Sequence, residues 1–213
     1  EMNRMSRRDV EYESDGTTVR GWLYTPDKGT PPYPAVVMAG GWCYVKEIVM
    51  PEIAERFVEE GLACLLFDYR NFGESDVHDV EQQVDPWAQI EDYQNALSFA
   101  ELQDDIDERR LGVWGISYSG GHVLILAAID PRIRCVVSNI PVTDGYRQMR
   151  LVHNEEDFNQ LWQLIVDDRR RRFRGEEPDT MQMSVRNPGA TDFSKTPYTW
   201  GVGDIKEPFM KLK

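Results

Sequence analysis

Cysteine, histidine and long apolar runs are scarce in this chain of 213 residues. The three cysteines are odd in number, and their spacing matches no metal motif. Cys64 and Cys135 lie within apolar runs, so we expect buried free thiols at both positions. Cys43 lies in a loop without the surroundings of a nucleophile. The sequence therefore predicts neither a metal nor another cofactor.

No apolar run approaches the length that spans a membrane, and no charged-then-apolar leader opens the chain. We therefore expect a cytoplasmic protein without a membrane partner. The length and the 41% hydrophobic content favour a single domain with a substantial core.

Basic residues are outnumbered, with 24 Lys and Arg against 37 Asp and Glu, for a net charge of −13. This balance argues against a nucleic-acid partner, because phosphate binding needs a basic face. The run Arg169–Arg172 is the exception. Asp167 and Asp168 precede Arg171 and Arg172 by four residues, which favours ion pairs at a solvated helix end over the alternative, a phosphate-binding patch.

Two alternating segments, 10–14 and 17–24, flank Asp15-Gly16 and predict a β-hairpin. Short apolar strands then alternate with helices, which predicts an α/β fold with a mostly parallel sheet, flanking helices and the hairpin as an antiparallel edge. We expect buried strands at 35–39, 62–67, 111–114 and 133–137, and helices at 51–60, 86–100 and 120–129. Asp85 is expected to cap the second helix, which would bury Trp87, Ile90, Leu97 and Ala100.

The alternation stops after Ser138. Asn154 can cap a helix with three acidic residues in its first turn and an apolar stripe formed by Phe158, Leu161, Trp162 and Ile165. We therefore divide the single domain into a core at 1–144, a helical cap-like segment at 145–175 and an irregular tail at 176–213.

A candidate nucleophile lies where the strand at 111–114 meets the helix at 120–129. Strand, tight turn with serine, and helix form the nucleophile elbow, in which small residues two before and two after the serine prevent a clash. Around Ser117 these are Gly115 and Ser119, where the usual motif has a second glycine. Ser119 is the rival nucleophile, and a serine that only caps the helix is the structural alternative. We favour Ser117, because it falls in the turn.

Attack by serine on a carbonyl carbon needs donors for the oxyanion that develops. The backbone N–H of Tyr118, at the start of the helix, is one candidate. The N–H of Trp42 is the other, because Gly40 and Gly41 before it let the backbone approach a substrate closely. A plain glycine turn is the alternative for this loop.

Three stretches make the chain resemble the α/β hydrolases of the dienelactone-hydrolase-like group, with its bacterial esterases and polyketide-associated hydrolases: 40–47, 67–75 and 114–122. The resemblance covers roughly residues 10 to 145. It implies the α/β-hydrolase fold, truncated at its C-terminal strands, and a structural role for the loop 68–75. Relatives often have His-Gly where this chain has Gly40-Gly41.

The same resemblance places a catalytic acid after a later strand and a histidine after the last one, and this sequence shows neither. His78 is expected at the surface and His122 in packing, whereas His153 would have to swing toward Ser117. Asp144 is an unsupported candidate for the acid. Asp104, Asp105 and Asp107 lack the spacing of a calcium loop and indicate a solvated turn.

Two functions follow. The first is a serine hydrolase or acyltransferase that acts on a small-molecule ester, lactone or thioester through a Ser117 acyl-enzyme. The second is a non-catalytic binding or assembly protein that kept the fold and lost the triad, because a serine without a base is a poor nucleophile.

Two structural expectations complete this interpretation. The segment 145–175 is predicted to cap the mouth above Ser117, with Phe158 and Trp162 lining an apolar acyl pocket or only packing their helix. The strand at 133–137 is predicted to form an exposed sheet edge, which pairs with a second copy or is covered by residues 176–213.

Overall fold

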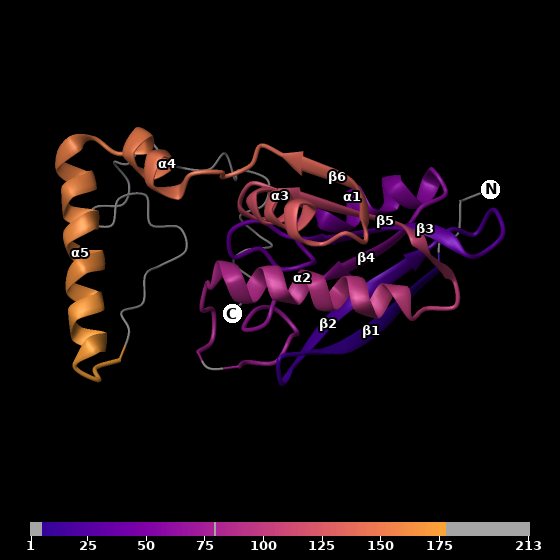
Figure 1. Cartoon of the computed structure of the whole chain (residues 1–213), viewed down its shortest axis with the longest axis horizontal. Helices are drawn as coiled ribbons and strands as arrows, with labels where there is room; N and C mark the ends of the chain where they lie inside the picture. Colours follow the sequence, from indigo (N-terminus) through magenta and orange to yellow (C-terminus); the bar gives the residue numbers. More distant parts are fainter. Residues whose placement is uncertain (1–5, 79, 178–213) are drawn as a thin grey trace. The chain divides into compact units, whose positions relative to one another are not determined.

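A six-stranded sheet organises the first part of the chain in the computed structural model, which describes residues 6–78 and 80–177 (Figure 1). The strand order is β1-β2-β4-β3-β5-β6. The neighbours among β4, β3, β5 and β6 are parallel, and the two pairings of β2 are antiparallel. The elements are β1 (Ser6–Ser14), β2 (Thr17–Thr25), β3 (Tyr33–Ala39), α1 (Met50–Glu59), β4 (Ala63–Phe67), α2 (Pro86–Glu101), β5 (Ile106–Ile116), α3 (Tyr118–Ile129) and β6 (Ile133–Asn139).

The opening hairpin forms as the sequence predicts. Ser14 pairs with Thr17, so Asp15 and Gly16 are the two turn residues. Both have positive φ, 51° and 75°, the backbone form that two-residue hairpin turns require and that Asp-Gly adopts readily. The hairpin extends the parallel strands as an antiparallel edge.

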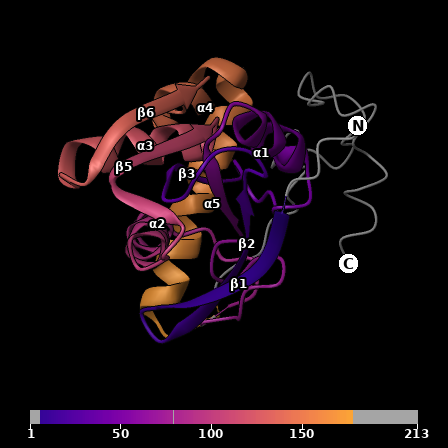
Figure 2. The ribbon, with the colours of Figure 1, turned by 90° about the vertical axis from the view of Figure 1, so that its right-hand side faces the viewer.

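Helices cover both faces of the sheet, with α1 against β2 and β4, and α2 and α3 against the other face (Figure 2). Leu66 belongs to the buried cluster that receives Met50 and Ala54 of α1. Its neighbour Phe67 meets the ring of Tyr93 on α2, with centroids 5.0 Å apart. Since successive side chains of a strand point to opposite faces, one apolar strand serves two cores. The predicted mostly parallel α/β sheet is therefore confirmed.

Three expected burials are wrong, although the strand at 133–137 does lie at an edge of the sheet as predicted. Strand β6 is the last in the sheet order, and most of its residues are exposed, Cys135 and Val137 among them. Only Cys64 is a buried thiol as expected. Trp87 is 68% exposed, whereas Ile90, Leu97 and Ala100 are buried. At about 100° per residue, Trp87 lies about 120° around the helix from Tyr93, which faces the sheet.

The described residues 144–177 belong to a second compact unit, which we describe by itself. It contains α4 (Gly145–Val152) and α5 (Glu155–Phe173), capped by the side chains of Asp144 and Asn154. Phe158 is buried, and the ring of Tyr146 meets it edge-on. The position of the segment 145–175 above Ser117 stays a prediction. Of the tail 176–213, residues 178–213 lie outside the described residues.

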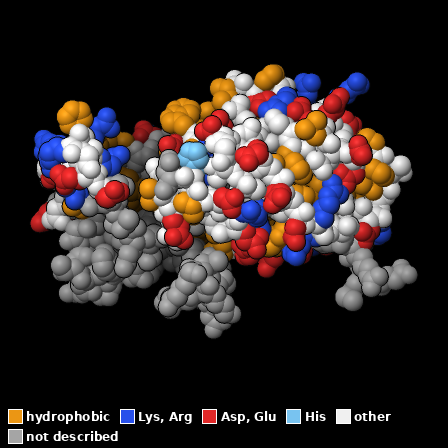
Figure 3. Space-filling view, turned by 90° about the horizontal axis from the view of Figure 1, so that it is seen from below, with side chains coloured by type: hydrophobic (Ala, Val, Ile, Leu, Met, Phe, Trp, Pro, Cys, Tyr) orange, Lys and Arg blue, Asp and Glu red, His pale blue; other side chains and the backbone are white. Residues whose placement is uncertain are grey.

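Charged side chains are spread widely over the surface. On the face drawn in Figure 3, acidic groups are interspersed with fewer basic ones. Two arginines of the run on α5 are paired within their own helix, as Arg172 binds Asp168 at 2.8 Å and Arg170 binds Asp167 at 3.1 Å. No helix among the described residues has the length and apolar character needed to cross a membrane.

Candidate active site

Ser117 occupies a strained turn between β5 and α3. Its φ is 56° and its ψ is −110°, a conformation that a non-glycine residue adopts only when its surroundings impose it. The backbone N–H of Ser117 donates to Asn139 O at 2.9 Å, and its carbonyl accepts from Val142 N at 2.9 Å. The last residue of β6 and the loop that follows it therefore hold the turn in place.

The close approach of strand and helix explains the glycine two residues before Ser117. A Cβ built on Gly115 would lie 2.3 Å from Ser119 O, a backbone atom that cannot move aside cheaply. This is the steric requirement that the elbow motif predicts.

The two candidate serines differ in their surroundings. Ser119 is fully buried, and its Oγ accepts from Ile116 N at 2.8 Å. The same hydroxyl lies 3.1 Å from Ala39 O, so it joins the turn to β3. Ser117 is partly exposed, and no described residue hydrogen-bonds to its Oγ. Of the two, only Ser117 has a hydroxyl that no described residue binds.

The glycine loop after β3 lies directly beside this turn. A Cβ on Gly41 would be 3.4 Å from Ser117 Cβ and 3.8 Å from Tyr118 N. The ring of Trp42 meets that of Tyr118 edge-on, with centroids 5.1 Å apart. The backbone N–H groups of Trp42 and Tyr118 donate to no acceptor in the described part of the chain. The structure thus brings together the serine and both residues that the sequence nominated as oxyanion donors.

Gly40 occupies the position where relatives often have histidine. A Cβ there would lie 2.6 Å from Tyr44 Cβ, because Tyr44 folds back over the loop. A larger residue at position 40 would therefore clash with Tyr44 unless the loop moved.

Burial makes two nearby side chains poor acid–base catalysts. It raises the pKa of the Cys43 thiol to about 12, which disfavours the nucleophilic thiolate. It lowers the pKa of His122 to about 4, so this imidazole is neutral near pH 7. His122 packs edge-on against Tyr118 and Tyr69, at 4.8 and 5.8 Å between ring centroids. The expected packing role for His122 agrees with these contacts.

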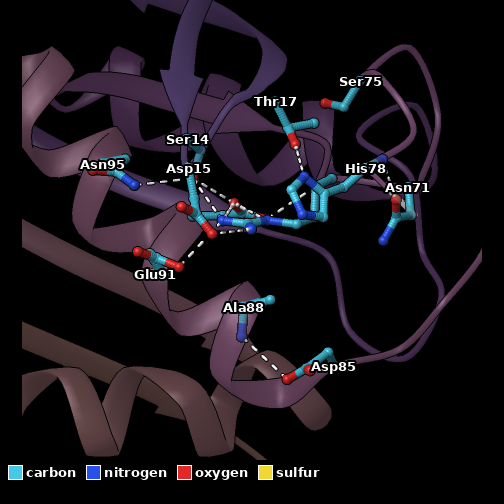
Figure 4. A network of polar contacts seen from close by, with 12 residues as sticks. Ser14, Asp15, Thr17, Asn71, Ser75, His78, Asp85, Ala88, Glu91 and Asn95 are labelled. Atoms are coloured by element: carbon cyan, nitrogen blue, oxygen red, sulfur yellow. Dashed lines mark hydrogen bonds and ion pairs between the residues drawn. The ribbon is translucent and has the colours of Figure 1, made fainter. Parts of the chain in front are cut away.

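The other two histidines have local partners. His78 Nδ1 lies 2.6 Å from Thr17 Oγ1, and its backbone N–H donates to Asn71 Oδ1 at 2.7 Å (Figure 4). His153 Nδ1 lies 2.8 Å from Met149 O in the second unit. Asp144, the unsupported acid candidate, accepts from Arg147 N as a helix cap. Within each unit, none of these hydrogen bonds joins two of the residues considered for the triad in the described part of the chain.

Asp105 and Asp107, at the start of β5, have partners as well. Asp105 binds Arg8 at 2.7 Å, and Asp107 binds Arg110 at 2.6 Å. The neighbouring guanidinium groups lower the pKa of both carboxyls. Both carboxylates are therefore engaged in ion pairs.

The loop after β4 is tied to the hairpin and to α2 through buried polar groups. Arg70 Nε donates to Asp92 Oδ1 at 2.8 Å, and Ser14 Oγ donates to the same oxygen at 2.6 Å. Asn95 Nδ2 donates to Ser14 Oγ at 2.9 Å, and Ser14 and Asn95 can be followed in Figure 4. Buried hydrogen bonds therefore connect this loop to the hairpin and to α2.

Sequence reasoning missed one feature of the site, a fully buried lysine. Lys46 lies four residues after Trp42, and its Nζ binds Asp68 Oδ2 at 2.7 Å. The two residues are 22 positions apart, and no local pattern pairs them. The only signal was the presence of both in the stretches that resemble relatives.

A serine on a sharp strand-to-helix turn, at the carboxyl edge of a mostly parallel sheet, defines the class of α/β hydrolases. Within this class, the model of the X-Pro dipeptidyl-peptidase (S15) family matches residues 15–181. The chain therefore belongs to that family.

Relatives with assigned names share much of the sequence. The chain is 45% identical to thiohydrolase aneE of Aspergillus aculeatus over 138 residues, which are 64% of this chain and 42% of that protein. It is 33% identical to polyketide transferase af380 of Aspergillus fumigatus over 199 residues, 92% of this chain and 62% of that protein. The chain thus spans about half the length of these relatives.

A solved structure also matches this chain. The crystal structure of the alpha/beta hydrolase GrgF from Penicillium sp. sh18 superposes with a TM-score of 0.67 at 31% identity. The superposition covers 82% of this chain and 57% of that one. The α/β-hydrolase fold predicted from the sequence is confirmed.

Proposed function

We propose that the protein is a serine hydrolase or acyltransferase that forms an acyl-enzyme on Ser117. The observation that carries the proposal is the position of the Ser117 hydroxyl beside two uncommitted backbone amides, those of Trp42 and Tyr118. This arrangement suits acyl transfer, because the charge that develops on a carbonyl oxygen needs preorganised donors.

In the proposed reaction, Ser117 Oγ bonds to the carbonyl carbon while its proton passes to a base. The carbonyl electron pair moves to the oxygen, where the N–H groups of Trp42 and Tyr118 stabilise it. Collapse of this intermediate breaks the C–O or C–S bond, and the leaving group takes the proton. Water or another acceptor nucleophile then attacks the Ser117 ester and releases the enzyme.

The base has to be a group that the described contacts of Ser117 do not include. His153 or a histidine supplied by further sequence would serve, with an acid to orient it. Without that base the hydroxyl reacts slowly. The rate at which Ser117 reacts therefore reports whether the protein under test has its triad.

An ester, lactone or thioester is the substrate class that we propose, with a thioester favoured. The support comes from relatives named as a thiohydrolase and a polyketide transferase. Hydrolysis of a small-thiol acyl thioester, compared with that of an aryl ester carrying the same acyl group, tests this preference. A higher kcat/KM for the aryl ester than for the thioester would contradict it.

A fluorophosphonate probe tests the nucleophile directly. We expect covalent labelling of the wild-type chain and none of Ser117→Ala, because Ser117 is the one elbow serine whose side chain is not buried. Ser119→Ala is the matched control, and it should keep its label if it folds. Equal labelling of wild type and Ser117→Ala would exclude Ser117.

The second candidate function is a non-catalytic binding or assembly protein of the same fold. The observation that favours it is the absence of any described residue bonded to Ser117 Oγ. Hydrolysis of simple aryl esters by the 213-residue chain, abolished by Ser117→Ala, would contradict this alternative.

A further inference from the structure

The loop that carries Trp42 is anchored by a buried ion pair. Lys46 is fully buried, and its Nζ donates to Asp68 Oδ2 at 2.7 Å and to Glu74 Oε2 at 2.6 Å, with Glu47 Oε1 at 3.1 Å. The backbone N–H of Lys46 donates to the other oxygen of Asp68, Oδ1, at 2.6 Å. One carboxylate therefore binds both the main chain and the side chain of the same residue.

The loop after β4 closes around this carboxylate. Glu74 N donates to Asp68 Oδ2 at 3.1 Å, and Ser75 Oγ donates to Asp68 O at 2.7 Å. Gly73 has a φ of 57°, and a Cβ on it would lie 2.3 Å from Asp68 Oδ2. The glycine thus leaves the space that the carboxylate fills, and the position of Asp68 is fixed from several sides.

Stability alone is a weak reason for such a pair. Removing two charges from water is costly, and a buried ion pair often stabilises a fold no better than apolar residues of similar volume. What the pair does supply is geometry, because hydrogen bonds to a charged acceptor are short and directional. Only three residues separate Trp42 from Lys46, so the anchor restricts where the Trp42 N–H can point.

We propose that Asp68 and Lys46 are positioning residues, which aim the Trp42 N–H at the oxyanion by fixing the loop 40–46. The inference rests on the proposed function, since it assigns an effect on acylation at Ser117. Neither side chain touches the substrate. Displacement of a catalytic group by about 1 Å can cost about 100-fold in rate, so a loosened anchor should have a measurable effect.

Asp68→Asn tests the proposal because the amide keeps the shape and replaces one acceptor oxygen with a donor. In place of Oδ1, that donor would face the backbone N–H of Lys46; in place of Oδ2, it would face Lys46 Nζ and Glu74 N. We expect the maximal rate of fluorophosphonate labelling to fall by about 10- to 100-fold, with the concentration for half-maximal rate unchanged. Asp76→Asn is the matched control, because Asp76 lies on the same loop but is half-exposed and paired with Arg20.

Hydrogen exchange gives a readout that does not depend on turnover. In Asp68→Asn the amides of residues 40–46 should exchange faster, while those of β3 stay protected. If the wild type is not labelled at all, the proposed function fails, and the exchange of this loop still decides whether the pair positions it. The inference is overturned if Asp68→Asn is labelled as fast as the wild type and its residues 40–46 exchange no faster than those of the wild type.

Glu74→Gln covers the case in which Asp68→Asn does not fold. The Glu74 side chain is 63% exposed and touches Lys46 from the solvent side, so this variant loosens the anchor without leaving a charge buried alone. We expect a smaller fall in labelling rate at an unchanged melting temperature. A labelling rate equal to that of Asp76→Asn would count against the proposal.

Discussion

Ser117 and Ser119 stand two residues apart in the same turn, and their hydroxyl groups have opposite surroundings. The Ser119 hydroxyl forms hydrogen bonds with Ile116 N and Ala39 O, so it is engaged within the folded protein. Ser117 keeps its hydroxyl uncommitted among the described residues, at the cost of a strained backbone. Strain of this kind is maintained because neighbouring segments hold the turn on both sides.

His122 leads to a prediction about pH at the same scale. Burial lowers the pKa of His122 from 6.5 to about 4. Between these pH values His122 is protonated in the unfolded chain and neutral in the folded chain. Stability from this group is present above pH 6.5 and is lost as the pH falls toward 4. The largest effect is about 3 kcal/mol.

Urea unfolding of wild type and His122→Phe between pH 4 and 7 measures this contribution. The free energy of unfolding of the variant should depend less on pH across this window, because phenylalanine does not titrate. Parallel pH profiles for the two proteins would mean that His122 does not titrate as its burial implies.

At the scale of elements, the contact between β5 and α3 decides whether the elbow can form. A strand and a helix approach closely enough here that only hydrogen fits on Gly115. The N-terminus of α3 thereby lies beside Ser117, where its free N–H groups favour negative charge. The site therefore depends on a packing distance as much as on a particular side chain.

Gly115→Ala tests this packing. The added methyl group would overlap the Ser119 carbonyl, so we expect the free energy of unfolding to fall by about 1–3 kcal/mol and Ser117 labelling to decrease. Gly145→Ala makes the same change where a Cβ meets nothing within 4 Å, and it should be nearly neutral. Equal melting temperatures for the two variants would show that the close contact has no energetic weight.

At the scale of the whole molecule, β6 is the exposed edge of the sheet. It is the last strand in the order, and Val136 and Val137 are 38% and 42% exposed. Unpaired backbone groups and apolar side chains together favour association. We therefore predict that this edge pairs with a second copy of the chain or is covered by residues 176–213.

Sedimentation of wild type and Val137→Lys distinguishes these cases. Pairing through the edge predicts an oligomer that the charged variant dissociates, whereas a covering tail predicts a monomer in both. In either case the amides of Val136 and Val137 should be protected from exchange. A wild-type monomer whose amides there exchange rapidly would contradict both forms of the prediction.

Much of the fold was readable from short stretches of sequence, because local sterics and hydrogen bonding act over a few residues. Asp15-Gly16 fixes the hairpin turn by its readiness for positive φ. Asp85 caps α2 by accepting from Trp87 N and Ala88 N, one residue before Pro86. The elbow was readable for the same reason, since Gly115 and Ser117 lie in one turn.

Burial and long-range pairing were decided only by the tertiary structure. The sequence could not show that Trp87 is exposed, because apolar character does not say whether a neighbour covers a side chain. It also could not pair Lys46 with Asp68, or show that the Ser119 hydroxyl forms hydrogen bonds with Ile116 N and Ala39 O. Those relations join segments far apart in the chain, and only the packing of the sheet against its helices and loops brings them together.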